Sequence, residues 1–495
     1  MSSVLEKLKP IFSLIPEISL PTSFPTAKER IFWTAFALLL FFIMYHIPAI
    51  GVDPRVFSTV SFLQLITASK IGTLITVGIG PIILASIFMQ LLVGAKIIDV
   101  NLSDPRERAN FHGAQKLLAF ILSFFEAFVF TTYLSSSGYI LTLFGPYTFW
   151  LVVLQISLGS IILFYLDEIL SKYGLGSGIS LFIAAGVAFS ILAGVLNIFF
   201  GYSGILSIIS EGGALVFSKI FEALLPLFAT IVILLVVVYF EGIKVEVPIS
   251  YGFGTSSAIP LKFFYLSNIP VILAVAFLAN IQFFAMLLVD QNLCIGGNLN
   301  LEVPNKAYAC EGGIDLINVI GRAERQGQSA RFVDGIFYLL SPVHHNPEQS
   351  YFAQINSYFT YTTPIFNIPE WVHIIIYLLF LVTLCILFGI LWVDLTGMGP
   401  ADVAKQIDSL GFQIPGYRRD VRILTSVLEK YIPPLVLVGS ISVGLLAGLA
   451  DLLGALGTGT GILLTVSIIS NFYQSIERYN ILGQSSLLYN FLKKR

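Results

Sequence analysis

The chain has 495 residues, of which 56% are hydrophobic and only 11% charged, and its formal net charge is −2. An average soluble domain is about 25% charged, so this composition excludes a soluble multidomain protein and indicates a membrane protein with several spans. The small net charge excludes a global attraction to nucleic acids or anionic surfaces. Three cysteines are too few for a disulfide framework.

The first 30 residues hold four prolines and no apolar run long enough for a signal peptide, so we expect no cleaved signal here. A membrane-spanning helix needs about 20 apolar residues, and ten such runs follow. They lie at about 31–50, 71–95, 114–135, 147–170, 179–200, 220–240, 266–289, 371–393, 432–454 and 459–478. The last two runs must form a tight hairpin, whose glycines between Gly454 and Gly461 supply positive φ angles.

The distribution of basic residues predicts the orientation. Twenty of the 27 lysines and arginines fall on the side that holds both termini, so the positive-inside rule places both termini in the cytosol. An even number of spans agrees with this. We expect a cytosolic segment 1–30, a first half 31–200, a second half 201–478 with an external loop 290–370, and a cytosolic tail 479–495.

The loop 290–370 contains the two cysteines that would face an oxidising space. Cys294 and Cys310 therefore either form a disulfide or remain two free thiols. The pair His344–His345 lies in the same loop, but its spacing fits no zinc ligand pattern, so we expect no metal.

Motifs for chemistry are absent from the sequence. There is no G-x-x-x-x-G-K-[ST] loop and no H-E-x-x-H pair, so we expect neither catalytic residues nor a cofactor, and no enzyme. Coupled transporters usually carry several ionisable residues inside the membrane. Here Glu126 is the main candidate, and it fits a hydrogen-bonded structural or gating residue better than a proton carrier. Prolines and glycines break run two at Gly78–Pro81 and run seven at Pro270, and such breaks in both halves point to a central pathway.

Several segments resemble one family. The segment 66–81 (ITASKIGTLITVGIGP) is similar to the plug and second helix of SecY, above all archaeal SecY, the α-subunit family of the Sec translocon. Further similar segments occur in the family's order along nearly the whole membrane region. They are 166–169, 171–179, 267–273, 279–282, 412–418, 431–434, 454–457 and 461–468.

The resemblance implies an all-α polytopic membrane protein. Ten transmembrane helices in two inverted five-helix halves would surround a central pore, with a short plug helix. A ring of apolar side chains would close the pore, since an apolar constriction dewets yet yields around a peptide. By motif position the ring comprises Ile79, Ile83, Ile179, Ile183, Ile272 and Leu464. Without the resemblance, isoleucine pairs at i,i+4 indicate only lipid contact or core.

The resemblance also implies three further sites. The plug, at about 61–70, would include Phe62, Leu63, Leu65, Ile66 and Thr67, although the segment alone also fits an interfacial amphipathic helix. Runs two and three, facing runs seven and eight, would form a lateral gate with the polar residues Glu126 and Asn280. Ribosome docking would use Lys405, Arg418, Arg419 and Arg422, whose positive charge equally fits the topology rule.

A SecY-like channel would translocate secretory polypeptides and insert membrane proteins laterally into the bilayer. The expected partners are SecE-like and SecG/β-like small membrane subunits, the ribosome, signal sequences, nascent polypeptides and membrane lipid. The expected location is the cell membrane, or the endoplasmic reticulum membrane in a eukaryote. The alternative is an ion-coupled secondary transporter. Two departures stand out: the segment 245–261 lacks Lys and Arg, and the external loop is longer than usual in this family.

Overall fold

The computed structural model of the chain describes residues 15–478 apart from a set of gaps. The gaps are 22, 24, 55–67, 95–96, 99, 101–104, 137, 202–203, 213–215, 252–254, 267–268, 290–293, 296–297, 301–308, 312–313, 316–320, 327–328, 344–350, 364–365, 410–411 and 414–419.

Ten helices of the described chain correspond to the ten predicted runs, which confirms a helical polytopic membrane protein. They are α2 (Ala27–His46), α4 (Gly80–Gly94), α5 (Pro105–Ser136), α6 (Tyr147–Tyr173), α7 (Gly178–Phe200), α9 (Val216–Gly242), α10 (Ile269–Val289), α14 (Glu370–Thr396), α17 (Ile432–Leu452) and α18 (Gly459–Arg478). Seven stretches of described helix are long and apolar enough to cross a membrane, while α4 and the described part of α10 are shorter.

The second span differs from its prediction. A helix was expected over 71–95, but α4 begins only at Gly80, and residues 71–79 form buried turns. Gly72 and Gly78 have φ angles of 89° and 62°, which are accessible to glycine but costly for other residues. Pro81 then occupies the first turn of α4, where its missing N–H costs nothing.

The turn between α17 and α18 agrees with its prediction. Gly454 and Gly457 have φ angles of 62° and 78°, as a sharp reversal requires. Thr458 also has a positive φ, 65°. The side chain of Asp451 accepts a hydrogen bond from the backbone N–H of Gly459 at 2.6 Å and so caps the start of α18.

In chain order the ten helices fall into two halves of five. One half contains α2 and α4–α7, and the other contains α9, α10, α14, α17 and α18. The halves meet along two seams, where α4 packs against α10 and α14, and α7 packs against α18 and α9. One apolar cluster of buried residues includes side chains from both halves and occupies the junction between them.

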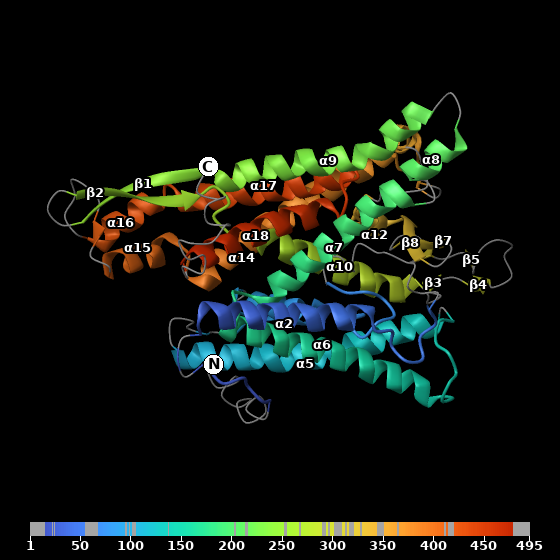
Figure 1. Cartoon of the computed structure of the whole chain (residues 1–495), viewed down its shortest axis with the longest axis horizontal. Helices are drawn as coiled ribbons and strands as arrows, with labels where there is room; N and C mark the ends of the chain where they lie inside the picture. Colours follow the sequence, from blue (N-terminus) through green and yellow to red (C-terminus); the bar gives the residue numbers. More distant parts are fainter. Residues whose placement is uncertain are drawn as a thin grey trace.

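The end of the bundle that carries β1 and β2 is called the hairpin end (Figure 1). Its elements are β1 (Lys244–Tyr251), β2 (Thr255–Lys262), α15 (Pro400–Ser409), β9 (Phe412–Gln413) and α16 (Val421–Leu428). The three strands form an antiparallel sheet in the order β2-β1-β9, with Lys244 opposite Lys262. These strands were not predicted, although the alternation of Val245, Glu246 and Val247 is a strand signal.

The opposite end of the bundle is called the far end. It carries the short helices and strands of the long loop together with α8. These are α8 (Ile205–Glu211), β3 (Cys294–Ile295), β4 (Asn298–Asn300), β5 (Ala309–Glu311), β6 (Ile314–Asp315), β7 (Arg322–Gln326), β8 (Ser329–Asp334), α12 (Ile336–Leu339) and α13 (Tyr351–Thr360). The strands pair as β3-β6, β4-β5 and β7-β8, all antiparallel.

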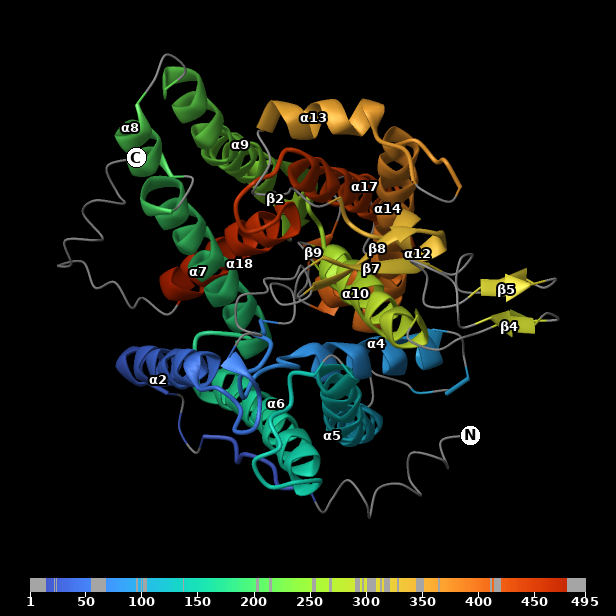
Figure 2. The same cartoon turned by 90° about the vertical axis from the view of Figure 1, so that its right-hand side faces the viewer.

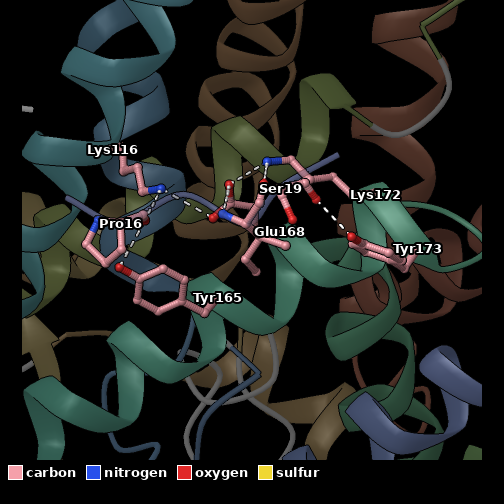
Figure 3. A network of polar contacts seen from close by, with 8 residues as sticks. Pro16, Ser19, Lys116, Tyr165, Glu168, Lys172 and Tyr173 are labelled. Carbon is pink, nitrogen blue, oxygen red and sulfur yellow. Dashed lines mark hydrogen bonds and ion pairs between the residues drawn. The ribbon is translucent and has the colours of Figure 1, made fainter. Parts of the chain in front are cut away.

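Residues 15–21, which we call the N-terminal strap, lie across α5 and α6 near the hairpin end (Figure 3). Glu168 is the centre of the contact: its carboxylate binds Lys116 at 3.3 Å and Lys172 at 2.8 Å, and it accepts from the N–H of Ile18 at 3.3 Å. Lys116 also donates to the carbonyl of Pro16 at 3.0 Å, and Lys172 donates to the carbonyl of Ile18. Two tyrosine hydroxyls also donate to strap carbonyls. Tyr165 donates to the same Pro16 carbonyl, and Tyr173 donates to the carbonyl of Ser19.

Candidate functional site: an apolar ring between the two halves

All six residues predicted for the ring lie in the single apolar cluster at the junction of the halves. Ile79, Ile83, Ile183 and Leu464 are buried members, and Ile179 and Ile272 pack against it half-buried. They come from the turn before α4 and from α4, α7, α10 and α18, which surround the middle of the molecule (Figure 2). The structure therefore brings together residues almost 400 positions apart, with no charged side chain among the six.

Close packing against α6 determines the position of the backbone that leads to Ile79. The hydroxyl of Ser160 donates to the carbonyl of Gly78 at 2.9 Å, which fixes the backbone just before Ile79. Gly159 lies beside the same segment, and a Cβ there would come within 1.9 Å of the Leu74 carbonyl oxygen. Only glycine allows the two backbones to lie this close.

The start of α7, which carries two ring residues, is held by Asp167 at the end of α6. Its Oδ1 accepts a hydrogen bond from the backbone N–H of Ile179 at 2.9 Å. A carboxylate at this place satisfies an otherwise unpaired N–H and complements the positive end of the helix dipole. Asp167 thus sets where Ile179, and one turn later Ile183, enter the ring.

Leu464 is connected to the hairpin end through Glu241, in the last turn of α9. The carboxylate of Glu241 lies 3.4 Å from the ammonium of Lys262 in β2, and the hydroxyl of Ser467 donates to it at 2.9 Å. Ser467 lies about one helical turn beyond Leu464 on α18. The buried Glu241 and Ser467 therefore tie the β1–β2 hairpin to a helix of the ring.

The two predicted gate residues are both buried but have different surroundings. Asn280 in α10 donates to the carbonyl of Ala276, one turn back in its own helix, at 2.8 Å. Glu126 in α5 has one carboxylate oxygen, Oε1, with no hydrogen-bond partner among the described residues. Between their helices lies α4, which packs against both α5 and α10. A buried carboxylate oxygen without a partner is costly, so Glu126 is a candidate for a role that needs a polar group at this seam.

Comparison with known proteins identifies the family. The family model described as SecY matches residues 73–473, most of the chain. The protein translocase subunit SecY of Methanocaldococcus jannaschii is 41% identical over 479 residues, which cover 96% of this chain and 97% of the relative. The chain belongs to the SecY family.

Solved structures of SecY-family channels have the same fold. A structure of a protein conducting channel is 39% identical, with a TM-score of 0.73, and the alignment covers 97% of this chain and 100% of the other. Sec61 in the canine ribosome–channel complex from the endoplasmic reticulum is also 39% identical, with a TM-score of 0.71 and the same coverage. The resemblance inferred from the sequence is therefore confirmed.

Of the predicted plug, about 61–70, only the last part is described. Phe62, Leu63, Leu65, Ile66 and Thr67 lie outside the described residues. Ala68, Ser69 and Lys70 follow them, and Ala68 is buried against α7, where a Cβ on Gly186 would lie 3.8 Å from its Cα. Lys70 then packs over the ring of Tyr45, at 5.3 Å from its centroid. The described end of the segment thus packs against α7, the helix that carries Ile179 and Ile183.

The predicted docking residues are partly described. Lys405 on α15 is exposed and lies 3.5 Å from Asp402, and Arg422 is exposed at the start of α16. Arg418 and Arg419 lie outside the described residues. Cys294 and Cys310 lie in β3 and β5, which pair with different strands, and their side chains are outside the described set. The disulfide stays a prediction.

The sequence analysis missed the residues that position the ring: Ser160, Asp167, Glu241 and Ser467. A signal was present for two of them, because Asp167 and Glu241 are carboxylates at the ends of apolar helices. A carboxylate of this kind is expensive to bury unless it has a specific partner, and each has one here.

Proposed function

We propose that this chain is the central subunit of a protein-conducting channel, which translocates secretory polypeptides and releases membrane proteins sideways into lipid. The observation that carries the proposal is the apolar ring at the junction of the two halves. Such a ring excludes water and ions at rest, because an apolar constriction dewets, and its flexible side chains can part around a polypeptide. The channel performs no covalent chemistry and needs no cofactor.

The hairpin end faces the cytosol in this proposal, with both termini on the same side of the cell membrane. Support comes from the excess of lysine and arginine on that side. The β1–β2 hairpin with α15 and α16 would then meet the ribosome, as Sec61 does in the ribosome–channel complex. Lys405 and Arg422, both exposed, and Arg418 and Arg419 are the proposed contacts with ribosomal RNA.

The seam of α4 with α10 and α14 is the proposed lateral gate, with Glu126 and Asn280 as its polar residues. Support comes from the packing of α4 against both helices of the other half. Signal sequences and membrane helices would leave the pore here for lipid. The plug would fill the funnel at the far end of the ring, consistent with the packing of Ala68 on α7. SecE-like and SecG/β-like single-span subunits complete the proposed assembly.

Crosslinking tests the proposal. Single cysteines at Ile83 and Leu464 should crosslink to a secretory chain arrested on ribosomes. Cysteines at Leu235 and Ile375, exposed on the outer faces of α9 and α14, are the controls. Equal yields at all four positions would refute the channel. Copurification of two small single-span proteins tests the assembly separately.

A further inference from the structure

The helix α13 lies flat across the ends of three membrane-spanning helices. The hydroxyl of Tyr351 donates to the carbonyl of Leu453 at 3.2 Å, and that of Tyr358 donates to the carbonyl of Leu452 at 3.1 Å. These carbonyls mark the far end of α17, and α13 also packs against α14 and α9. Figure 2 shows α13 at the edge of the molecule, across the direction of the bundle. The helix α13 therefore lies at the membrane surface, at the depth where these spans leave the bilayer.

The surface of α13 divides into three strips, because successive residues are 100° apart around a helix. One strip, with Tyr351, Gln354 and Tyr358, faces the protein. The second strip is apolar and exposed: Phe352 is 54% accessible, Ile355 38% and Phe359 73%. The third strip is exposed and polar or small, with Ala353, Asn356 and Thr360.

Three strips of this kind are what a helix needs when it lies in the plane of a membrane surface beside a protein. One strip binds the protein, one enters the lipid, and one faces water. An apolar strip with full access to water would instead cost free energy in proportion to its area. The order of the strips around α13, with protein-facing and water-facing strips on either side of the apolar one, fits this arrangement.

The apolar strip adjoins surface that already faces lipid. Trp371 and Ile375 are exposed at the start of α14, the membrane span against which α13 packs, and Leu453 is exposed at the end of α17. Tyr361 and Phe366, in the segment that joins α13 to α14, add exposed aromatic rings, and rings of this kind gather where a bilayer meets water. Phe352 and Phe359 on the α13 strip add two more exposed rings.

We propose that α13 is an interfacial anchor. Phe352, Ile355 and Phe359 insert into the boundary between headgroups and acyl chains of the leaflet at the far end, and the partner is phospholipid. The helix contains no charged residue, so the contact is apolar and does not depend on anionic headgroups. It ties the far ends of α9, α14 and α17 to the membrane plane. The inference requires only that these helices span the bilayer, not that the chain conducts polypeptides.

Site-directed spin labelling tests the anchor in the full chain reconstituted into phosphatidylcholine bilayers. The background carries Cys294→Ser and Cys310→Ser, while the buried Cys385 stays unlabelled. For each label we compare the collision rate with oxygen to that with a water-soluble nickel chelate. This oxygen-to-nickel ratio should be several-fold higher at Phe352→Cys and Phe359→Cys than at Asn356→Cys and Thr360→Cys. The controls lie on the same helix, so loss of folding would change all four alike.

Two results would overturn the proposal. If the labels at Phe352 and Phe359 meet the nickel chelate as often as those at Asn356 and Thr360, the apolar strip faces water. If they meet neither reagent, a protein covers the strip, either a second copy of this chain or a small subunit. Adding anionic phosphatidylglycerol should leave the oxygen-to-nickel ratios unchanged. An increase at Phe352 or Phe359 would show that the contact depends on headgroup charge and would refute that part of the proposal.

Discussion

Replacing Glu168 by glutamine should release the N-terminal strap from the first half of the bundle. The carboxylate binds two lysines and the backbone N–H of Ile18 in one place (Figure 3). Glutamine has nearly the same shape but no charge. The substitution therefore removes the charge of the contact while it leaves the packing in place.

The size of the effect follows from the burial of the partners. The Lys116 side chain is only 7% exposed and that of Glu168 only 15%, so solvent screens this pair weakly, whereas Lys172 is more exposed and contributes less. A hydrogen bond to a charged group contributes about 1.5–3 kcal/mol and a neutral one about 1 kcal/mol. Two weakened bonds and a lysine left without its carboxylate lower the free energy of detaching the strap by roughly 2–3 kcal/mol. This is below the cost of breaking a fully buried pair.

Proteolysis after Glu17 measures this loss. Glu17 is exposed, but the strap on both sides of it is bonded to α5 and α6, so cleavage by an endoprotease specific for glutamate requires local detachment. When opening is fast, the cleavage rate follows the open population. A loss of 2–3 kcal/mol raises that population about 30- to 140-fold, at tenfold for each 1.4 kcal/mol.

The matched control is Glu246→Gln, the same substitution at an exposed carboxylate in β1. Cleavage after Glu17 should be as slow in this variant as in the original protein. If Glu168→Gln is cut no faster than Glu246→Gln, the two lysines hold the strap without the carboxylate, and the reasoning on charge is wrong.

Three further substitutions test how the ring is built. Asp167→Ala should lower the free energy of unfolding by about 0.5–2 kcal/mol, as the loss of a helix cap does. It should also raise the resting ion conductance in planar bilayers, because the start of α7 loosens. Gly159→Ala should lower the free energy of unfolding by at least about 3 kcal/mol, the upper range for overpacking, while Gly176→Ala, with open space around it, should leave thermal unfolding unchanged. Ile83→Ser should raise conductance, whereas the same change at the exposed Leu235 should not. Equal conductance in the two variants would contradict a seal at Ile83.

The spans were predictable because hydrophobic length is a strong and local signal. Each of the ten runs corresponds to a helix, with edges that differ by a few residues in most cases. Two starts differ by nine residues: α5 begins at Pro105 and not at about 114, and α4 begins at Gly80 and not at about 71. Residues 71–79 are as apolar as a helix, but their backbone follows the positive φ angles of Gly72 and Gly78 and the contact with α6. The break predicted at Gly78–Pro81 agrees with the start of α4 at Gly80. Hydropathy does not record close approaches, so it did not show that the residues before this break form turns.

The six residues of the predicted ring could be named only through the resemblance to a family, and the structure places them in one apolar cluster. An isoleucine that seals a pore and one that packs in a core have the same local sequence pattern. What distinguishes Ile83 from the lipid-facing Phe88 on the same helix is burial against the other half of the molecule. That property depends on the tertiary arrangement of α4, α7, α10 and α18.

The polar residues around the predicted ring give its purely apolar side chains a defined position. Apolar contacts are non-directional, so the six side chains alone would not fix where their helices start or how far they slide. At three places a hydrogen bond next to the ring supplies this direction: Ser160 at Gly78, Asp167 at Ile179 and Glu241 at Ser467. All three act on backbone or on a side chain outside the ring, which leaves the ring itself free to deform. The last of them also contacts Lys262 at the base of the β1–β2 hairpin, so one buried carboxylate bonds both to that hairpin and to the helix of Leu464.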